Sequence, residues 1–139
     1  MTSEGRARQA WDAMRTLVLD SHDRRAEVCA ALGMSFFRIK VLRRVAAGPV
    51  TMSELVERLR SDAPYVSIVV EDLVGRGLVV RTSHPDDRRR KIVSVTQEGA
   101  AAAARAEEVL GRPPAALEAL PDEELKALEQ ALARMLKDN

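Results

Sequence analysis

The segment from Leu78 to Thr96, LVVRTSHPDDRRRKIVSVT, restricts the possible folds more than any other part of the chain. Two short runs rich in β-branched residues, Leu78–Thr82 and Ile92–Thr96, flank a tip with Pro85, two aspartates and four consecutive cations. Alternating β-branched residues favour strands, and Pro with Asp favours turns. The segment is therefore predicted to form a β-hairpin with an exposed basic loop.

Four successive cations crowd the tip of this hairpin, namely Arg88, Arg89, Arg90 and Lys91. Their mutual repulsion is relieved when a polyanion lies nearby, and a narrow groove of DNA supplies one. The alternative is a solvated loop with no partner. We predict that the hairpin is a wing that contacts DNA, and that His84 beside it contacts phosphate.

Two helices are predicted directly before the hairpin. Thr51 and Glu54 fit a capping box, which starts a helix over residues 52–60. Pro64 suits the first turn of a second helix, over residues 64–76. A helix, a turn, a second helix and a basic hairpin occur in this order in a winged helix-turn-helix.

The second of these helices has a buried face and an outward face. The i, i+3, i+4, i+7 spacing predicts a buried stripe of Val66, Val69, Val70 and Leu73. Tyr65, Ser67 and Ile68 then face outward near the helix start, although a core position for Tyr65 is the alternative.

Helical patterns also reach both ends of the chain, in keeping with only 3% aromatic residues. Residues 4–32 have helical spacing with a polar middle, LDSHDRR. At this point we expect either a kink in the helix or a stretch that other parts of the protein cover only in part. Ser35 caps a helix over residues 36–46, and residues 49–51 are expected to add a third strand. Thr96 caps a helix that continues to residue 110.

The last helix is expected to begin after Pro121, with one apolar stripe of Leu125, Leu128, Leu132 and Leu136. A winged helix of roughly 65 residues cannot cover this stripe together with the apolar positions of the N-terminal helix. We therefore expect both terminal helices to pack on a second copy in a two-fold dimer. Paired recognition helices about one DNA turn apart read a palindrome.

The net charge of +1 hides an uneven distribution. Residues 36–60 carry six cations and two acids, a net charge of +4, and residues 76–91 carry the same numbers. Residues 92–139 carry nine acids and five cations, a net charge of −4. A basic middle with an acidic C-terminal third is expected when one face meets nucleic acid.

Several classes of protein are not expected. The single cysteine, Cys29, excludes an intramolecular disulfide and favours a reducing compartment. No apolar run approaches the ~20 residues of a membrane span, so a cytoplasmic protein with no membrane partner is expected. His22 and His84 lack partners at metal-ligand spacing, and no catalytic grouping or phosphate-binding glycine loop is recognisable. We expect no metal, no cofactor and no enzyme.

Four segments, TMSELVERL, EDLVGRGLVVR, HPDDRRRKIVSVTQEG and LPDEELKALEQAL, resemble the MarR family of bacterial transcription regulators in order and spacing. The resemblance covers about residues 35–129. It implies a mainly α fold with a small β-hairpin wing, in which a winged helix-turn-helix (35–96) lies between N-terminal (1–34) and C-terminal (97–139) dimerisation helices. It also implies a homodimeric repressor that binds double-stranded DNA at a palindromic operator and, in many members, a small-molecule effector.

The family's wing motif Asp-x-Arg falls on Asp87 and Arg89, which makes Arg89 the expected minor-groove contact and Asp87 the carboxylate that steadies the loop. The start of the recognition helix falls on Pro64, Tyr65, Ser67 and Ile68. Members often have a polar or basic residue in place of Ile68 and a small hydroxyl in place of Tyr65. Few side chains are therefore expected to read bases through hydrogen bonds, with Ser67 and the Tyr65 hydroxyl as the main candidates, and Ile68 is a candidate for thymine methyl contacts. Contacts to the DNA backbone are predicted for Thr51, Ser53 and Arg60.

A possible ligand pocket for an aromatic carboxylate is formed by one arginine and four apolar residues, Trp11, Arg15, Met34, Phe36 and Phe37. The alternative is that these residues belong to the dimer core. The favoured function is a dimeric DNA-binding repressor whose DNA affinity is modulated by a small ligand. A winged-helix protein-interaction module and a thiol-based redox sensor acting through Cys29 are the alternatives.

Overall fold

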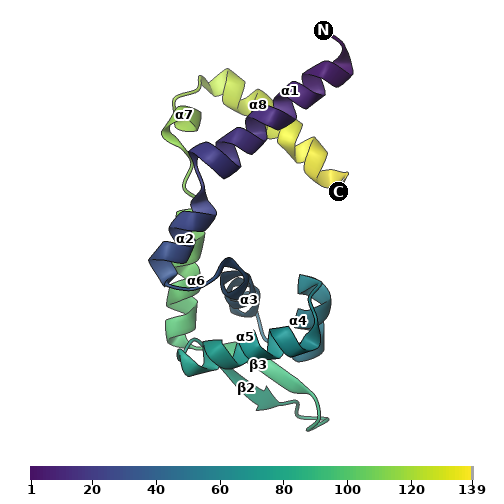
Figure 1. The fold of residues 1–139 in the computed structure, drawn as a ribbon, viewed down its shortest axis with the longest axis vertical. Coiled ribbons are helices and arrows are strands. Elements are labelled where there is room, and N and C mark those ends of the chain that lie inside the picture. The colour runs from purple at the N-terminus through teal and green to yellow at the C-terminus, as the bar shows by residue number, and fades with distance from the viewer. Residues whose placement is uncertain (139) are drawn as a thin grey trace.

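The computed structural model describes residues 1–138 as an elongated molecule with two different ends (Figure 1). We call the end with α1 (Ser3–Arg15), α7 (Ala115–Glu118) and α8 (Asp122–Lys137) the helical end. Two helices, α2 (Arg24–Leu32) and α6 (Gln97–Leu110), lead from it to the other end. The elements between α2 and α6 in sequence form that other end, which we call the winged end.

The N-terminal helical segment is interrupted in its polar middle. A π-helical stretch, η1 (Thr16–Ser21), follows α1, and the chain leaves helical geometry before α2. Asp23 then starts α2 by accepting a hydrogen bond from the backbone N–H of Ala26 at 3.1 Å. Gly33 ends α2 with a φ of 67°, which costs glycine little because it has no Cβ. The expected kink is thus a break between two helices.

The winged end follows the predicted order of elements. Ser35, Thr51 and Asp62 accept hydrogen bonds that cap its three helices, and the capping box of Thr51 and Glu54 is present. Its elements are α3 (Phe36–Ala46), β1 (Val50–Thr51), α4 (Met52–Leu59), α5 (Ala63–Gly75), β2 (Val79–Ser83) and β3 (Lys91–Val95).

The sheet of the winged end is antiparallel with strand order β1-β3-β2. Val93 of β3 lies opposite Val50 on one side and Arg81 on the other. Ser83 and Lys91 form the last pair before the loop. The predicted hairpin and the predicted third strand are both confirmed.

The buried core lies mainly in the winged end and extends into the two connecting helices. The predicted stripe of α5 is completely buried and packs with side chains of α3, α4 and the sheet. Val28 of α2 and the alanines Ala103 and Ala106 of α6 belong to the same cluster. The core therefore continues across residues 34 and 96, where the sequence suggested boundaries.

A close contact fixes the start of α6 against the start of β2. The Thr96 hydroxyl donates to the carbonyl of Gly77 at 2.7 Å, and its backbone N–H donates to the carbonyl of Leu78 at 3.0 Å. A Cβ on Gly99 would lie 1.8 Å from the Leu78 carbonyl oxygen. Only glycine allows this approach, so Gly99 is a packing requirement of the fold.

The helical end differs from this closed core. Neither α1 nor α8 buries a single described side chain. Trp11 on α1 is 59% exposed and Leu136 on α8 is 73% exposed. The short helix α7 was not predicted, because its four residues between Pro114 and Pro121 are too few for a periodic pattern.

Candidate nucleic-acid interface

The tip of the wing is ordered by its own backbone and by short side chains. The backbone N–H of His84 donates to the carbonyl of Arg90 at 2.8 Å, which closes the loop. Asp87 Oδ1 accepts from the backbone N–H of Arg89 at 3.0 Å, and His84 Nδ1 accepts from the N–H of Asp86 at 3.1 Å. Asp87 therefore makes the loop-stabilising contact that was predicted. The ring of His84 makes a hydrogen bond within the loop, and its contact with phosphate stays a prediction.

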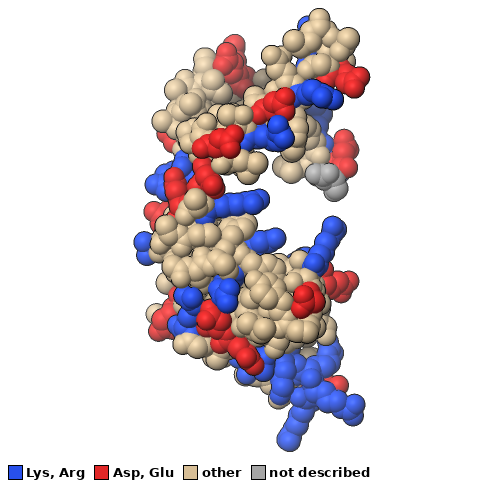
Figure 2. Space-filling model, in the orientation of Figure 1, with Lys and Arg blue, Asp and Glu red and all other residues tan. Residues whose placement is uncertain are grey.

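The cations of the tip point into solvent. Arg88, Arg89 and Arg90 are exposed and form no ion pair with any carboxylate of residues 1–138. Lys91 Nζ donates to Ser83 Oγ at 3.0 Å across the strand pair. Figure 2 shows a dense group of Lys and Arg side chains where the wing projects, at the opposite end from α8. The acidic C-terminal segment thus does not neutralise the wing within this chain.

The helix α5 presents its first turns to solvent. Asp62 accepts from the backbone N–H of Tyr65 at 2.8 Å, and Pro64 lies in the first turn as predicted. Ile68 is 57% exposed and Tyr65 39% exposed, whereas Ser67 is partly covered. The Tyr65 ring packs on Phe37 of α3, with ring centroids 5.0 Å apart. Tyr65 is therefore a surface residue whose ring packs on the partly buried ring of Phe37.

An ion-pair network anchors the far end of α5, which sequence reasoning missed. Asp72 Oδ2 accepts from Arg38 Nε of α3 at 2.9 Å and from Arg76 Nε at 2.8 Å. Arg76 also donates to the carbonyl of Gly33, at the joint between α2 and α3, at 3.2 Å. Hydrogen bonds from Arg76 first and Arg38 second hold the pKa of Asp72 below its ordinary value of 3.8.

Only part of this network has a sequence signal. Asp72 and Arg76 lie four residues apart on a predicted helix, a spacing at which opposite charges pair. Arg38 is 34 positions from Asp72, and its contact follows only from the packing of α3 on α5.

The three predicted backbone contacts lie on or beside α4 and have different surroundings. Thr51 is 8% exposed and its hydroxyl accepts from the backbone N–H of Glu54 at 3.2 Å, so its side chain is already used in the cap. Ser53 is exposed in the first turn. Arg60 is exposed at the C-terminal end of α4 with a φ of 50°, a rare value for a residue other than glycine. Ser53 and Arg60 are therefore the accessible members of this predicted set.

The residues predicted to line a ligand pocket do not share one site within the described chain. Trp11 and Arg15 are exposed on α1, where Arg15 pairs with Asp12. Met34 is buried in the core of the winged end. Phe37 packs on Tyr65, and the guanidinium of Arg25 lies 5.0 Å from the centroid of the Phe36 ring. The pocket stays a prediction.

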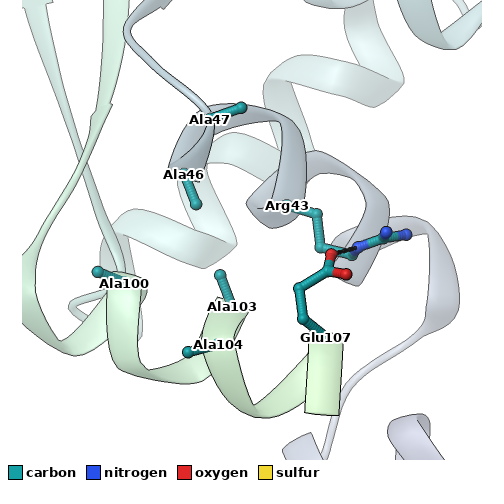
Figure 3. Close-up of a pocket in the computed structure, with 7 residues that line it drawn as sticks. All are labelled: Arg43, Ala46, Ala47, Ala100, Ala103, Ala104 and Glu107. Carbon is teal, nitrogen blue, oxygen red and sulfur yellow. Dashed lines mark hydrogen bonds and ion pairs between the residues drawn. The ribbon is translucent and has the colours of Figure 1, made fainter. Parts of the chain in front are cut away.

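A hollow that the structure does contain lies between α3 and α6. Figure 3 shows Ala46 and Ala103 facing each other across it, with an ion pair between Arg43 and Glu107 at one end. Its lining is completed by Ala47, Ala100 and Ala104. Within the alanine-rich part of α6, Ala103 and Ala106 are buried in the core, as the predicted packing role requires, whereas Ala100 and Ala104 are exposed.

The remaining predictions concern Cys29, metal binding and membrane spans. Cys29 is half-buried against the core, and its thiol-sensor role stays a prediction. Across residues 1–138, no grouping of three or more His, Cys, Asp or Glu side chains is placed to hold a metal ion. Nor does any helix in that part of the chain combine the length and apolar character needed to cross a bilayer.

The chain matches one protein-family model and many solved structures. A family model described as MarR family matches residues 32–90, from the end of α2 to the wing tip. A search of curated proteins finds no match.

Three solved structures illustrate the likeness of the whole fold. YusO from Bacillus subtilis has a TM-score of 0.78 at 20% identity, with 100% of both chains covered. The apo form of wild-type MarR from E. coli has a TM-score of 0.74 at 24% identity, with 98% of both chains covered. A cysteine-to-serine mutant of MarR from E. coli complexed with operator DNA has a TM-score of 0.64 at 22% identity, covering 98% of this chain and 99% of that chain. These chains share one fold over nearly their whole length.

Proposed function

We propose that this protein is a dimeric transcription regulator that binds a palindromic operator. The proposal is supported by the match of residues 32–90 to a MarR family model and by the winged-helix fold that the whole chain shares with YusO and MarR. The wing enters the minor groove and the start of α5 enters the major groove. Ser53 and Arg60 contact the phosphate backbone.

One observation carries this proposal. The wing holds four successive cations at an exposed tip, and its three arginines have no carboxylate partner within residues 1–138. Asp87 holds the loop through the N–H of Arg89, so the arginine side chain is free to extend. An arginine in this position fits the focused negative potential of a narrow minor groove.

The test is binding of fluorescent duplexes, selected from a random pool, as the salt concentration rises. Affinity is expected to fall steeply with salt, because phosphate contacts release counterions. The Arg89→Ala protein is expected to bind about tenfold more weakly. Arg105→Ala is the matched control, since Arg105 is an exposed arginine of α6 in none of the ion pairs described. Equal binding by parent and Arg89→Ala protein would rule out the proposed role of the wing.

The proposed dimer is supported by the uncovered apolar side chains of α1 and α8. Trp11, Leu128 and Leu136 are exposed in the single chain, and large exposed apolar groups on one region mark an interaction surface. A two-fold dimer through these helices carries two winged ends, as a palindrome requires. Analytical ultracentrifugation of the full chain measures this state.

The proposed effector is a small aromatic carboxylate that lowers or raises DNA affinity. Phe36 already accepts a guanidinium on its ring face, and Trp11 and Arg15 are exposed on the helix proposed for the dimer. A second copy is therefore needed to complete the pocket. Benzoate is a suitable probe: it is expected to change the affinity for a selected duplex, and an unchanged affinity up to millimolar benzoate would count against this class of effector.

A further inference from the structure

The helix α5 has an unusual set of side chains for an element that reads DNA. From Ala63 to Gly75 it contains no Arg, Lys, Asn or Gln. These are the side chains that read guanine or adenine through two hydrogen bonds. Its only charged groups are Glu71 and Asp72, and Asp72 is already engaged by two arginines. Bidentate reading of purines is therefore not available to this helix.

The first turns of α5 offer an apolar surface instead. Ile68 is 57% exposed, although isoleucine is among the residues most often buried. Tyr65 lies three positions earlier, so both side chains are neighbours on the helix surface. Phe37 supports the Tyr65 ring from α3. We call Tyr65 and Ile68 the apolar pair.

The polar groups beside the apolar pair discriminate poorly among bases. The Ser67 hydroxyl both donates and accepts hydrogen bonds, so it suits any base edge. Glu71 only accepts, which limits it to the amino group of cytosine, and its charge is repelled by phosphate. Thymine is the base that presents an apolar group, its C5 methyl, in the major groove.

We infer that this protein recognises its operator through thymine methyl groups that pack against Ile68 and Tyr65, an inference that rests on the proposed DNA-binding function. The basic wing supplies sequence-independent affinity, and the apolar pair supplies the choice of sequence. The operator half-site therefore contains thymine where the start of α5 enters the major groove.

The experiment uses the full chain and duplexes selected from a random pool. Each thymine of the selected half-site is replaced by deoxyuridine, which removes the methyl group and leaves base pairing unchanged. Replacement at the contacted position in one half-site is expected to weaken binding about fourfold, and in both half-sites about 16-fold, as for loss of one buried carbon each. A 5-methylcytosine·guanine pair placed there is expected to bind more tightly than a cytosine·guanine pair.

Variants locate the effect on the protein. Ile68→Ala is expected to reduce the difference in affinity between thymine and deoxyuridine duplexes, because the more exposed of the two partners of the methyl group is gone and only Tyr65 remains. Val74→Ala is the matched control: Val74 is 42% exposed on the same helix, six residues further on, and its truncation is expected to keep the fourfold difference.

The outcomes separate the inference from the proposed function. If a palindrome is selected but deoxyuridine at every thymine leaves the affinity unchanged, the methyl inference is wrong and the DNA-binding function stands. If no duplex is bound above the random pool, both are wrong. An undiminished difference between thymine and deoxyuridine duplexes in the Ile68→Ala protein also overturns the assignment to the apolar pair.

Discussion

The winged end and the helical end cover their apolar side chains in different ways. In the winged end, the stripe of α5 packs against α3, α4 and the sheet and is fully buried within one chain. In the helical end, α1 and α8 bury no described side chain, and Trp11, Met135 and Leu136 remain at least half exposed. The two ends also differ in charge, since Lys and Arg side chains gather at the wing, whereas acidic and basic side chains are mixed over the helical end (Figure 2).

This comparison separates two kinds of stability. A core closed within one chain unfolds as a unit whose stability does not depend on protein concentration. Apolar helices left open gain their stability from association, which does depend on concentration. Substitutions at the two ends test this division.

Gly99→Ala is expected to cause the largest loss of stability. A methyl group there meets the Leu78 carbonyl oxygen at 1.8 Å and the Val95 side chain at 2.8 Å, so α6 must move away from the sheet. We expect the free energy of unfolding to fall by about 3 kcal/mol. Chemical denaturation measures it.

Gly75→Ala is the control for that change. Nothing lies within 4 Å of a Cβ at Gly75, at the end of α5, so alanine there is expected to raise stability by at most about 1 kcal/mol. Equal effects of both substitutions would show that the winged end is not packed as closely as the structure indicates.

Leu128→Asp is expected to weaken the proposed dimer without unfolding the winged end. A carboxylate in the apolar stripe of α8 is expected to cost about 2 kcal/mol of association, or roughly thirtyfold in the dimer Kd. Sedimentation equilibrium measures the Kd, and circular dichroism checks the fold. Gln130→Asp adds the same charge about 160° around the helix, where no change in the Kd is expected. A variant that loses its fold together with its dimer would break the comparison.

Two threonine caps allow the same substitution at each end. Thr51 caps α4 beside the core, and Thr51→Ala is expected to lower the free energy of unfolding by about 1 kcal/mol. Thr2 caps the outer end of α1 by accepting from the N–H of Gly5 at 3.0 Å. Thr2→Ala is expected to cost only a few tenths of a kcal/mol, because fraying there is not coupled to a buried core. Thermal unfolding at matched protein concentrations compares the two.

The smallest effect concerns the pH dependence of stability. Because the pKa of Asp72 is lowered in the folded protein, its contribution is complete above the ordinary value of 3.8 and is lost as the pH falls through the lowered value. The stability difference between the parent and Asp72→Asn is therefore expected to shrink below pH 3.8. Asp122→Asn is the control at the helical end, since the Asp122–Lys126 pair is highly exposed and is expected to contribute little at any pH. A difference that stays constant with pH would contradict the role of the Asp72 carboxylate.

Local sequence signals predicted most of the winged end. The caps at Ser35 and Thr51 and the proline at position 64 mark helix starts through contacts within three residues, so they can be read without the tertiary structure. The hairpin and the buried stripe of α5 are likewise predicted locally, from the spacing at which β-branched and apolar residues recur along the sequence.

Contacts between distant elements escaped prediction. The Arg38–Asp72 ion pair and the Phe37–Tyr65 contact depend on how α3 crosses α5, which no spacing in the sequence encodes. The capping box of Thr51 was readable from the sequence, whereas its burial to 8% exposure follows from the position of β1 in the sheet. The phosphate contact of Thr51 stays a prediction.

The helix α6 also acts as a lever. Its 14 residues make it about 21 Å long, and a tilt of about 10° at one end moves the other by nearly 4 Å. This displacement exceeds the ~3.4 Å rise of one base pair. Since α6 begins directly after β3, with Gly99 packed against Leu78, a tilt of that size between the two copies of the proposed dimer would displace each wing by about one base pair along a bound duplex.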